Sequence, residues 1–277
     1  MKKHFLTFLI FIISVSLKAS TVDTLTVYSA SMQKEIKCVV IKPDSYAKGD
    51  QQYPVVYLLH GYSDNYAFWV KEVPEIKKYA DDFQMILVCP DGGYNSWYYD
   101  SPVKKSSRFE THITREILPY VDTHYRTQPD RKHRGITGLS MGGHGALYLA
   151  LRHTDLFGAA GSTSGGVDIK PFKKHWELTE QVGDSIQQKD NWEKMSVINM
   201  IDEYPTRQLS LIIDCGTDDF FYTVNKNLHE KLLQQEVPHD YTERPGGHTL
   251  EYWQNSIGYQ LLFFFKFFEA PNTFDKG

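Results

Sequence analysis

One pentapeptide near the middle of the chain restricts the fold more than any other stretch: Gly138-Leu139-Ser140-Met141-Gly142. It fits the pattern G-x-S-x-G, in which a sharp turn between a strand and a helix presents a serine nucleophile. Small residues two positions before and after the serine let strand and helix approach closely while the serine adopts an unfavourable backbone conformation. An apolar run, 135–139, precedes the serine, and a helix-favouring run, 146–151, follows it. This placement predicts that Ser140 is a nucleophile.

The first twenty residues have the layout of a secretory signal peptide. Lys2 and Lys3 precede an apolar stretch, 5–17, and the small residues Ala19 and Ser20 follow it. The stretch is short for a membrane span, and an uncleaved membrane anchor is the alternative. We therefore expect residues 1–20 to be removed. The mature protein, 21–277, would then be exported (periplasmic or secreted), without stable membrane association.

Charge and cysteine content exclude several classes of partner. Without the three lysines of the signal, 27 basic residues face 34 acidic ones, a balance of −7 that argues against nucleic acid or an anionic membrane. Cys38, Cys89 and Cys215 lie in apolar, strand-like contexts, and we expect all three to be small buried hydrophobes. No Cys/His spacing resembles a zinc site, and no metal or cofactor is expected.

Strand-like and helix-like segments alternate along the mature chain, which predicts an α/β fold with a mostly parallel sheet covered by helices on both faces. The first two strands form an antiparallel pair at one edge, and no linker or repeat divides the chain, so we expect one domain. The expected strands are 21–28, 34–42, 54–59, 83–89, 157–162, 209–214 and 239–243. The expected helices are 73–80, 108–124 with a kink at Pro119, 224–236 and 250–268.

Residues 168–205 interrupt this alternation. The segment is polar, carries Trp176 and Trp192, and lies between two expected strands. Long segments of this kind between strands are usually functional insertions, so we predict a small helical cap.

A serine nucleophile needs a base, usually a histidine oriented by a carboxylate, and the chain order on such sheets is serine, acid, histidine. The loop after the strand 209–214 supplies the candidate acids. Asp219 is favoured because it ends a G-x-x-D turn that begins at Gly216. Asp218 is the rival, and Asp214 is expected to lie within the strand.

The candidate base is His248, the last histidine of the chain, in Pro-Gly-Gly-His directly after the last expected strand. The glycines let this loop fold over the edge of the sheet. His239, at the start of that strand, is a competitor. His144 lies on the helix after the serine and is expected to pack or to hydrogen-bond instead.

Two further groups complete the expected site. The backbone N–H groups of Met141 and Tyr62 are predicted to form an oxyanion hole, with Gly61 allowing the turn. The adjacent aromatics Trp97, Tyr98 and Tyr99 lie near the carboxyl end of a strand, where substrates bind in open α/β sheets. They are our substrate-binding candidates for a sugar or an aromatic acyl group, and covering the rim of the core is the alternative.

Together these stretches resemble an esterase family of α/β-hydrolases that includes esterase D (S-formylglutathione hydrolase), tributyrin esterases, and carbohydrate esterase family 1 feruloyl and acetylxylan esterases. The resemblance runs in the family's order from about residue 35 to 268. It implies an α/β-hydrolase fold, a Ser140–Asp219–His248 triad and an oxyanion hole at Tyr62 and Met141. The matching stretches are 57–61, 90–98, 138–143, 215–219 and 245–253.

The resemblance implies a serine carboxylic-ester hydrolase that acts through an acyl-enzyme. Combined with export, it leads us to expect removal of acetyl or feruloyl-type groups from carbohydrate, with a small ester or an acylated carbohydrate as the substrate. A broad short-chain esterase, a thioesterase like S-formylglutathione hydrolase, and an acyltransferase are the alternatives.

Overall fold

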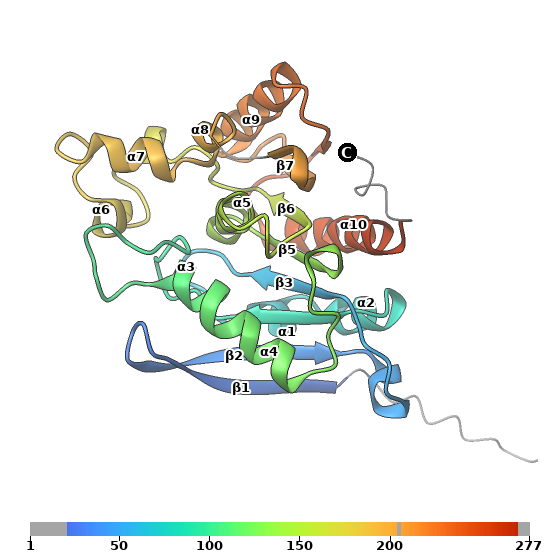
Figure 1. Cartoon of the computed structure of the whole chain (residues 1–277). Helices are drawn as coiled ribbons and strands as arrows, with labels where there is room; N and C mark the ends of the chain where they lie inside the picture. The colour runs from blue at the N-terminus through green and yellow to red at the C-terminus, as the bar shows by residue number, and fades with distance from the viewer. Residues whose placement is uncertain (1–20, 204–205, 271–277) are drawn as a thin grey trace, which may run out of the picture.

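The computed structural model describes residues 21–203 and 206–270; the expected signal peptide, 1–20, and the last two residues of the expected cap, 204–205, lie outside them. Its centre is an eight-stranded sheet with the strand order β1-β2-β4-β3-β5-β6-β7-β8 (Figure 1). The strands are β1 (Thr21–Ser29), β2 (Lys34–Lys42), β3 (Val55–Leu59), β4 (Ile86–Pro90), β5 (Arg134–Gly138), β6 (Ala159–Thr163), β7 (Ser210–Gly216) and β8 (Asp240–Arg244).

The sheet is antiparallel at one edge and parallel elsewhere. Strand β1 pairs antiparallel with β2, and β2 pairs antiparallel with β4. All later pairings, from β4–β3 to β7–β8, are parallel. The predicted mostly parallel sheet with an antiparallel edge is therefore confirmed. Because parallel strands end at the same edge, the loops that follow β3, β5, β7 and β8 are brought together there.

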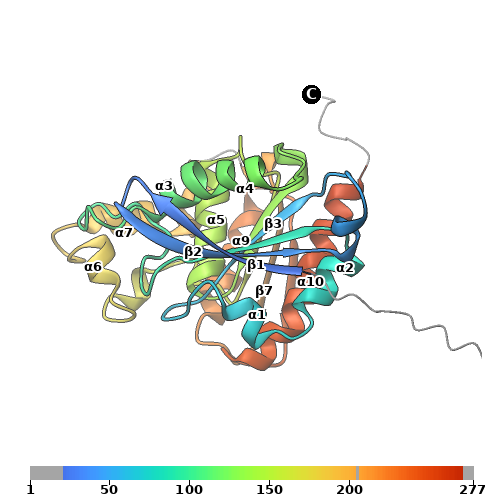
Figure 2. The ribbon, with the colours of Figure 1, turned by 90° about the horizontal axis from the view of Figure 1, so that it is seen from below.

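Helices cover both faces of the sheet, as Figure 2 shows from below. On β3 the side chains of Val55, Tyr57 and Leu59 belong to one apolar cluster and those of Val56 and Leu58 to the other, so the strand is buried on both faces. The first cluster includes residues of α4, α5 and α9, and the second includes residues of α1, α2 and α10. The helices are α1 (Phe68–Glu72), α2 (Ile76–Asp82), α3 (Phe109–Thr111), α4 (Leu118–His124), α5 (Met141–Arg152), α6 (Leu178–Val182), α7 (Lys189–Met195), α8 (Val197–Met200), α9 (Tyr222–Gln234) and α10 (Leu250–Glu269).

Two of the expected helices differ in the structure. The expected helix 73–80 begins later, as α2 at Ile76, because Pro74 disfavours a helical conformation at Val73; α1 ends at Glu72, before the expected range. The expected helix 108–124 consists of α3, a π-helical segment at His112–Ile117, and α4. Pro119 has no N–H to donate to the carbonyl four residues earlier, so a regular α-helical ladder cannot continue through this region.

Two strands begin later than the sequence pattern predicts. The expected strands 83–89 and 157–162 begin in the structure at Ile86 and Ala159. Met85 and Phe157, just before these strands, are fully buried, so an apolar pattern does not separate them from the paired residues.

Between β6 and β7 the chain forms a 3₁₀ turn at Lys170–Phe172 and the helices α6, α7 and α8. Cys38, Cys89 and Cys215 are all free and buried. Within residues 21–203 and 206–270, no helix combines the length and the apolar character needed to cross a membrane.

Candidate active site

Ser140 joins β5 to α5 in a strained backbone conformation, with φ 54° and ψ −117°. A positive φ is uncommon outside glycine and persists where the surroundings impose it. The glycines on either side are required sterically: a Cβ on Gly138 would lie 2.6 Å from the carbonyl oxygen of Leu59, and one on Gly142 would also collide with that oxygen. The sequence between these glycines therefore forms the sharp elbow that the motif predicts.

The structure brings Ser140, Asp219 and His248 together at the edge of the sheet where the parallel strands end. Nε2 of His248 lies 2.9 Å from Oγ of Ser140. Its Nδ1 lies 2.9 and 3.1 Å from the two carboxylate oxygens of Asp219. The three residues follow β5, β7 and β8, so they converge through strand topology although they are far apart in the sequence.

The hydrogen bonds determine which nitrogen of His248 carries the proton. A carboxylate only accepts hydrogen bonds, so Nδ1–H donates to Asp219, and Nε2 is left as the acceptor for the hydroxyl of Ser140. The N–H of Phe221 also donates to Asp219, at 2.8 Å, and holds the carboxylate in place. This arrangement can move the serine proton to the imidazole while Asp219 stabilises the resulting charge.

The other candidate acids and bases have different surroundings. Asp218 is exposed, in contrast to the buried Asp219. Asp214 lies within β7 and accepts hydrogen bonds from Ser256, at 2.6 Å, and from Gln260, at 2.7 Å. Both partners belong to α10, so this carboxylate fastens the helix to the sheet.

The two other histidines considered as candidates, His239 and His144, have different partners. His239 lies 2.7 Å from Nδ1 of His229. His144 is fully buried between Tyr99 and the carbonyl of Gly166. Burial lowers the pKa of His144 to about 4, although the bond to Gly166 opposes this shift.

The two expected oxyanion donors lie beside the serine. Met141 is the first residue of α5, where helix N–H groups have no acceptor within the helix. A Cβ on Gly61 would lie 3.7 Å from the Cβ of Ser140, so the turn that carries Tyr62 is packed against the nucleophile.

The structure does not place Trp97, Tyr98 and Tyr99 on a surface that a substrate could contact. All three are at most 1 % exposed. The hydroxyl of Tyr98 donates to the carbonyl of His60, and that of Tyr99 lies 2.7 Å from Nε2 of His144. Their side chains cover the core and support the loops around the site, which corresponds to the alternative interpretation of these aromatics.

Two other aromatics, Phe220 and Trp176, lie at the site. Phe220 follows Asp219 directly, is 51 % exposed, and places its ring 4.2 Å from that of His248. Trp176, from the segment before α6, stacks on Phe220 at 5.5 Å. The position of Phe220 next to the candidate acid was the only signal in the sequence.

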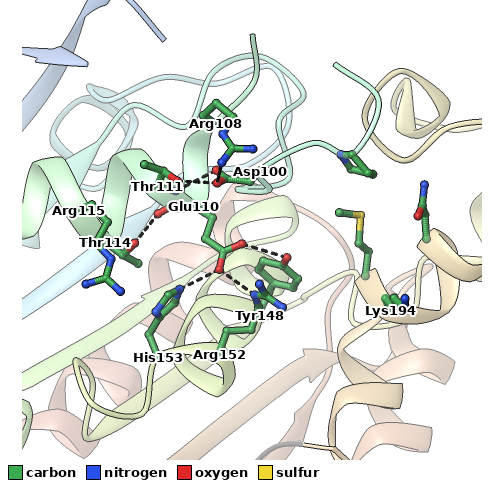
Figure 3. A pocket seen from close by; sticks show the side chains of 13 residues that line it. Asp100, Arg108, Glu110, Thr111, Thr114, Arg115, Tyr148, Arg152, His153 and Lys194 are labelled. Carbon is green, nitrogen blue, oxygen red and sulfur yellow. Dashed lines mark hydrogen bonds and ion pairs between the residues drawn. The ribbon is translucent and has the colours of Figure 1, made fainter. Parts of the chain in front are cut away.

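A cleft of about 430 Å³ lies at the end of α5 that is far from Ser140 (Figure 3). At its wall Glu110 receives hydrogen bonds from Arg152 and His153, both at 2.8 Å, and from Tyr148 at 3.2 Å. Burial raises the pKa of Glu110, but the bonds from His153 and Arg152 outweigh burial and hold it below its ordinary value. The carboxylate is thus a buried anchor for the end of α5.

Comparisons with known proteins identify relatives of this chain. An esterase of Mycobacterium tuberculosis (strain CDC 1551 / Oshkosh) is 29% identical over 236 residues, which are 76% of this chain and 52% of that protein, so the chain spans about half the length of this relative. An acetyl esterase of Caldicellulosiruptor saccharolyticus is 24% identical over 249 residues, covering 83% of this chain and 92% of that one. The solved structure of a ferulic acid esterase matches with a TM-score of 0.78 and 29% identity over 90% of this chain and 100% of the other.

The family model described as "Putative esterase" matches residues 29–264, most of the chain. The sheet order, the elbow at Ser140 and these matches lead to one conclusion: the chain belongs to the esterase family and has the α/β-hydrolase fold.

Proposed function

We propose that this protein is an exported serine esterase that removes acetyl or feruloyl-type groups from carbohydrate through an acyl-enzyme. The observation that carries the proposal is the continuous hydrogen-bonded line from Asp219 through His248 to Oγ of Ser140. A serine hydroxyl with such a partner is an activated nucleophile.

The proposed reaction has two halves. Oγ of Ser140 attacks the ester carbonyl while Nε2 of His248 takes the serine proton, and the N–H groups of Tyr62 and Met141 stabilise the oxyanion. The alcohol then leaves with the proton from His248, and Ser140 holds the acyl group. Water, deprotonated by His248, releases the acid and restores the serine. A backbone donor to the oxyanion contributes about 3 kcal/mol to the stability of the transition state.

Two features support the choice of acyl group. The exposed ring of Phe220 beside His248, with Trp176 stacked on it, offers an apolar face next to the reacting atoms. An aromatic acyl group such as feruloyl can pack on such a face. Proteins similar to this chain include an acetyl esterase and a ferulic acid esterase.

The test uses purified protein of residues 21–277 with methyl ferulate, acetylated xylan and short p-nitrophenyl esters. We expect hydrolysis of ferulate or acetyl esters and labelling of Ser140 by a fluorophosphonate. Absence of both would overturn the proposal. Fast turnover of p-nitrophenyl butyrate with no turnover of carbohydrate esters would identify a broad short-chain esterase instead.

Export is supported by the two lysines and the apolar stretch, 5–17, at the amino terminus. Amino-terminal sequencing of protein secreted from an expression host should find a start close to residue 21. A protein that stays with the cells and retains Met1 would contradict export.

A further inference from the structure

The cleft at the end of α5 that is far from Ser140 has a volume of about 430 Å³. Ligand clefts commonly measure about 300–1,000 Å³, so this one has room for a small organic ligand. Two parts of the fold line it (Figure 3). One wall consists of the segment 100–115 and the end of α5, and the other consists of α7, which belongs to the chain between β6 and β7.

Cations outnumber acids in the lining of this cleft. Besides one histidine, its ionisable side chains are two carboxylates and four cations: Asp100, Glu110, Arg108, Arg115, Arg152 and Lys194. The whole chain carries a net charge of −4, so this surplus of positive charge is local. Charges of one sign that line a concave surface concentrate the electric field and attract counter-ions. The lining therefore favours an anionic ligand.

Both carboxylates of the lining already have partners within the protein. Asp100 accepts a hydrogen bond from the N–H of Thr111 at 2.9 Å and pairs with Arg108 at 2.9 Å. Glu110 pairs with Arg152 at 2.8 Å, as described above. Two of the four cations are thus neutralised by these acids, and the surplus positive charge belongs to the other two.

The surplus charge lies on Arg115 and Lys194, which make no ion pair with any residue in the described ranges 21–203 and 206–270. Both side chains are exposed, so a ligand can reach them from solvent. Arg115 belongs to the π-helical segment and Lys194 to α7. Figure 3 shows them on opposite sides of the cleft, with Glu110 and Arg152 between them. A ligand that meets both cations must therefore extend across the cleft and carry a negative group toward each side.

The acidic residues nearest to these cations in the sequence do not neutralise them. Glu116, next to Arg115, bonds a histidine of its own segment at 2.6 Å. Glu193, next to Lys194, pairs at 3.1 Å with a lysine that does not line the cleft. Asp190 precedes Lys194 by one turn of α7, but it makes no ion pair with Lys194 and does not line the cleft.

The surroundings of the cations indicate which kind of anion fits. The apolar side chains of Pro102 and Met195 also line the cleft, and such a mixture suits a carbon skeleton better than an inorganic ion. The cleft lies at the carboxyl end of α5, where the helix dipole places partial negative charge. This charge opposes a compact, doubly charged phosphate more than it opposes single carboxylates spread along a ligand. Guanidinium and ammonium groups both donate strong hydrogen bonds to carboxylates.

We propose that this cleft is a second binding site of the protein, for an organic ligand that carries at least two carboxylates. One carboxylate pairs with Arg115 and another with Nζ of Lys194, while the carbon skeleton lies against Met195. The bound ligand thereby links α7 to the opposite wall. A short oligomer of uronic acid and a small polycarboxylate such as citrate both have this chemistry. The site is separate from Ser140 and does not depend on the function proposed above.

Calorimetric titration of the mature protein, 21–277, at low ionic strength measures this binding directly. The probes are trigalacturonate, citrate and inorganic pyrophosphate. We expect at least one of the two carboxylate probes to bind, and to bind more tightly than pyrophosphate. Tighter binding of trigalacturonate would identify an acidic oligosaccharide as the source of the carboxylates, and tighter binding of citrate would identify a small polycarboxylate.

Variants of the two unpaired cations locate the binding site. Arg115→Ala and Lys194→Ala should each weaken binding of the carboxylate probe about fivefold, the effect of one partly exposed ion pair, and Lys194→Glu should weaken it further. Lys189→Ala is the matched control, since it removes the same charge from the same helix at an exposed position outside the lining. It should keep the parent affinity. Because all of these side chains are exposed, urea unfolding should give each variant the stability of the parent.

Three results would overturn the proposal. They are a failure of both carboxylate probes to bind, tighter binding of pyrophosphate, and equal affinity in the parent, Arg115→Ala and Lys194→Ala. An equal loss in Lys189→Ala and Lys194→Ala would also overturn it, because the binding would then follow the general charge of α7. Added NaCl should weaken the binding, since exposed charges are screened over about 10 Å at 0.1 M salt. An affinity that does not change with salt would contradict recognition by Arg115 and Lys194.

Discussion

Helix α5 has a carboxylate–histidine pair at each end, and the two pairs differ in what surrounds them. At its start, Asp219 bonds Nδ1 of His248 at 2.9 Å, and the other nitrogen of that ring faces Ser140. At its end, Glu110 bonds Nε2 of His153 at 2.8 Å and also receives Arg152 (Figure 3). The two carboxylate–nitrogen distances are nearly equal, so distance alone does not identify a catalytic pair.

The difference lies in the partners of each carboxylate. Glu110 binds a permanent cation, Arg152, together with His153, so its charge is neutralised whether or not the imidazole is protonated. Asp219 has an imidazole and a backbone N–H as partners, so its charge is available to an imidazolium when one forms. A carboxylate–histidine pair suits proton transfer when its charge is uncommitted and a hydroxyl meets the second nitrogen.

The largest effect should come from removing the hydroxyl or the base. Ser140→Ala and His248→Ala should each lower kcat by about 10⁴-fold or more, because neither leaves an activated nucleophile. His153→Ala should change kcat by less than about twofold. Turnover of p-nitrophenyl acetate measures all three, and a comparable loss in His153→Ala would show that the distant pair takes part in the chemistry.

A loss of nearly the same size should follow from Asp219→Asn. The amide can donate to Nδ1 and so favour the wrong tautomer of His248, a change that costs about 10⁴-fold in serine hydrolases of the same design. Asp218→Asn should be much milder because this side chain is exposed. Comparing kcat/KM of the two variants checks the choice of acid, and the reverse order would move that role to Asp218.

A further histidine, His144, lies on α5 between the two carboxylate–histidine pairs. Its folded pKa of about 4 is below the ordinary value of 6.5, so the unfolded chain takes up a proton first as the pH falls. Its contribution to stability is complete above pH 6.5 and is lost between pH 6.5 and 4, by about 3 kcal/mol. Urea unfolding across this range should show a shallower pH dependence for His144→Gln, and parallel curves would contradict neutral burial.

The smallest effect should be a change in stability alone, at the pair formed by Glu110 and His153. Glu110→Gln should lower the free energy of unfolding by about 2 kcal/mol, since Arg152 and His153 lose a charged acceptor. The folded pKa of Glu110 is depressed, so its contribution is present above pH 4.5 and is lost as the pH falls below it. The difference from the parent should therefore shrink in acid. Glu236→Gln, with a side chain 85% exposed, is the control and should leave stability unchanged.

Much of this arrangement was predictable because local rules determine it. Glycines around Ser140 are demanded by close backbone approach, and strand order brings residues 140, 219 and 248 to one edge of the sheet. The far pair was not predictable from the pattern, because the contact between 110 and 153 depends on how α3 packs against the end of α5. The buried position of Trp97 was not predictable either, because the sequence of an aromatic after a strand is the same whether its side chain turns inward or outward.

The three cysteines give the molecule a built-in reporter. Cys38, Cys89 and Cys215 are each at most 1 % exposed, and burial raises the pKa of all three thiols. A thiol reagent can therefore reach them only when the sheet opens, because Cys38 lies on β2, Cys89 on β4 and Cys215 on β7. Labelling of the unmodified protein would time the opening of the sheet on both sides of its centre, at the neighbouring strands β2 and β4 and at β7. It would also separate loss of activity by local change at Ser140 from global unfolding.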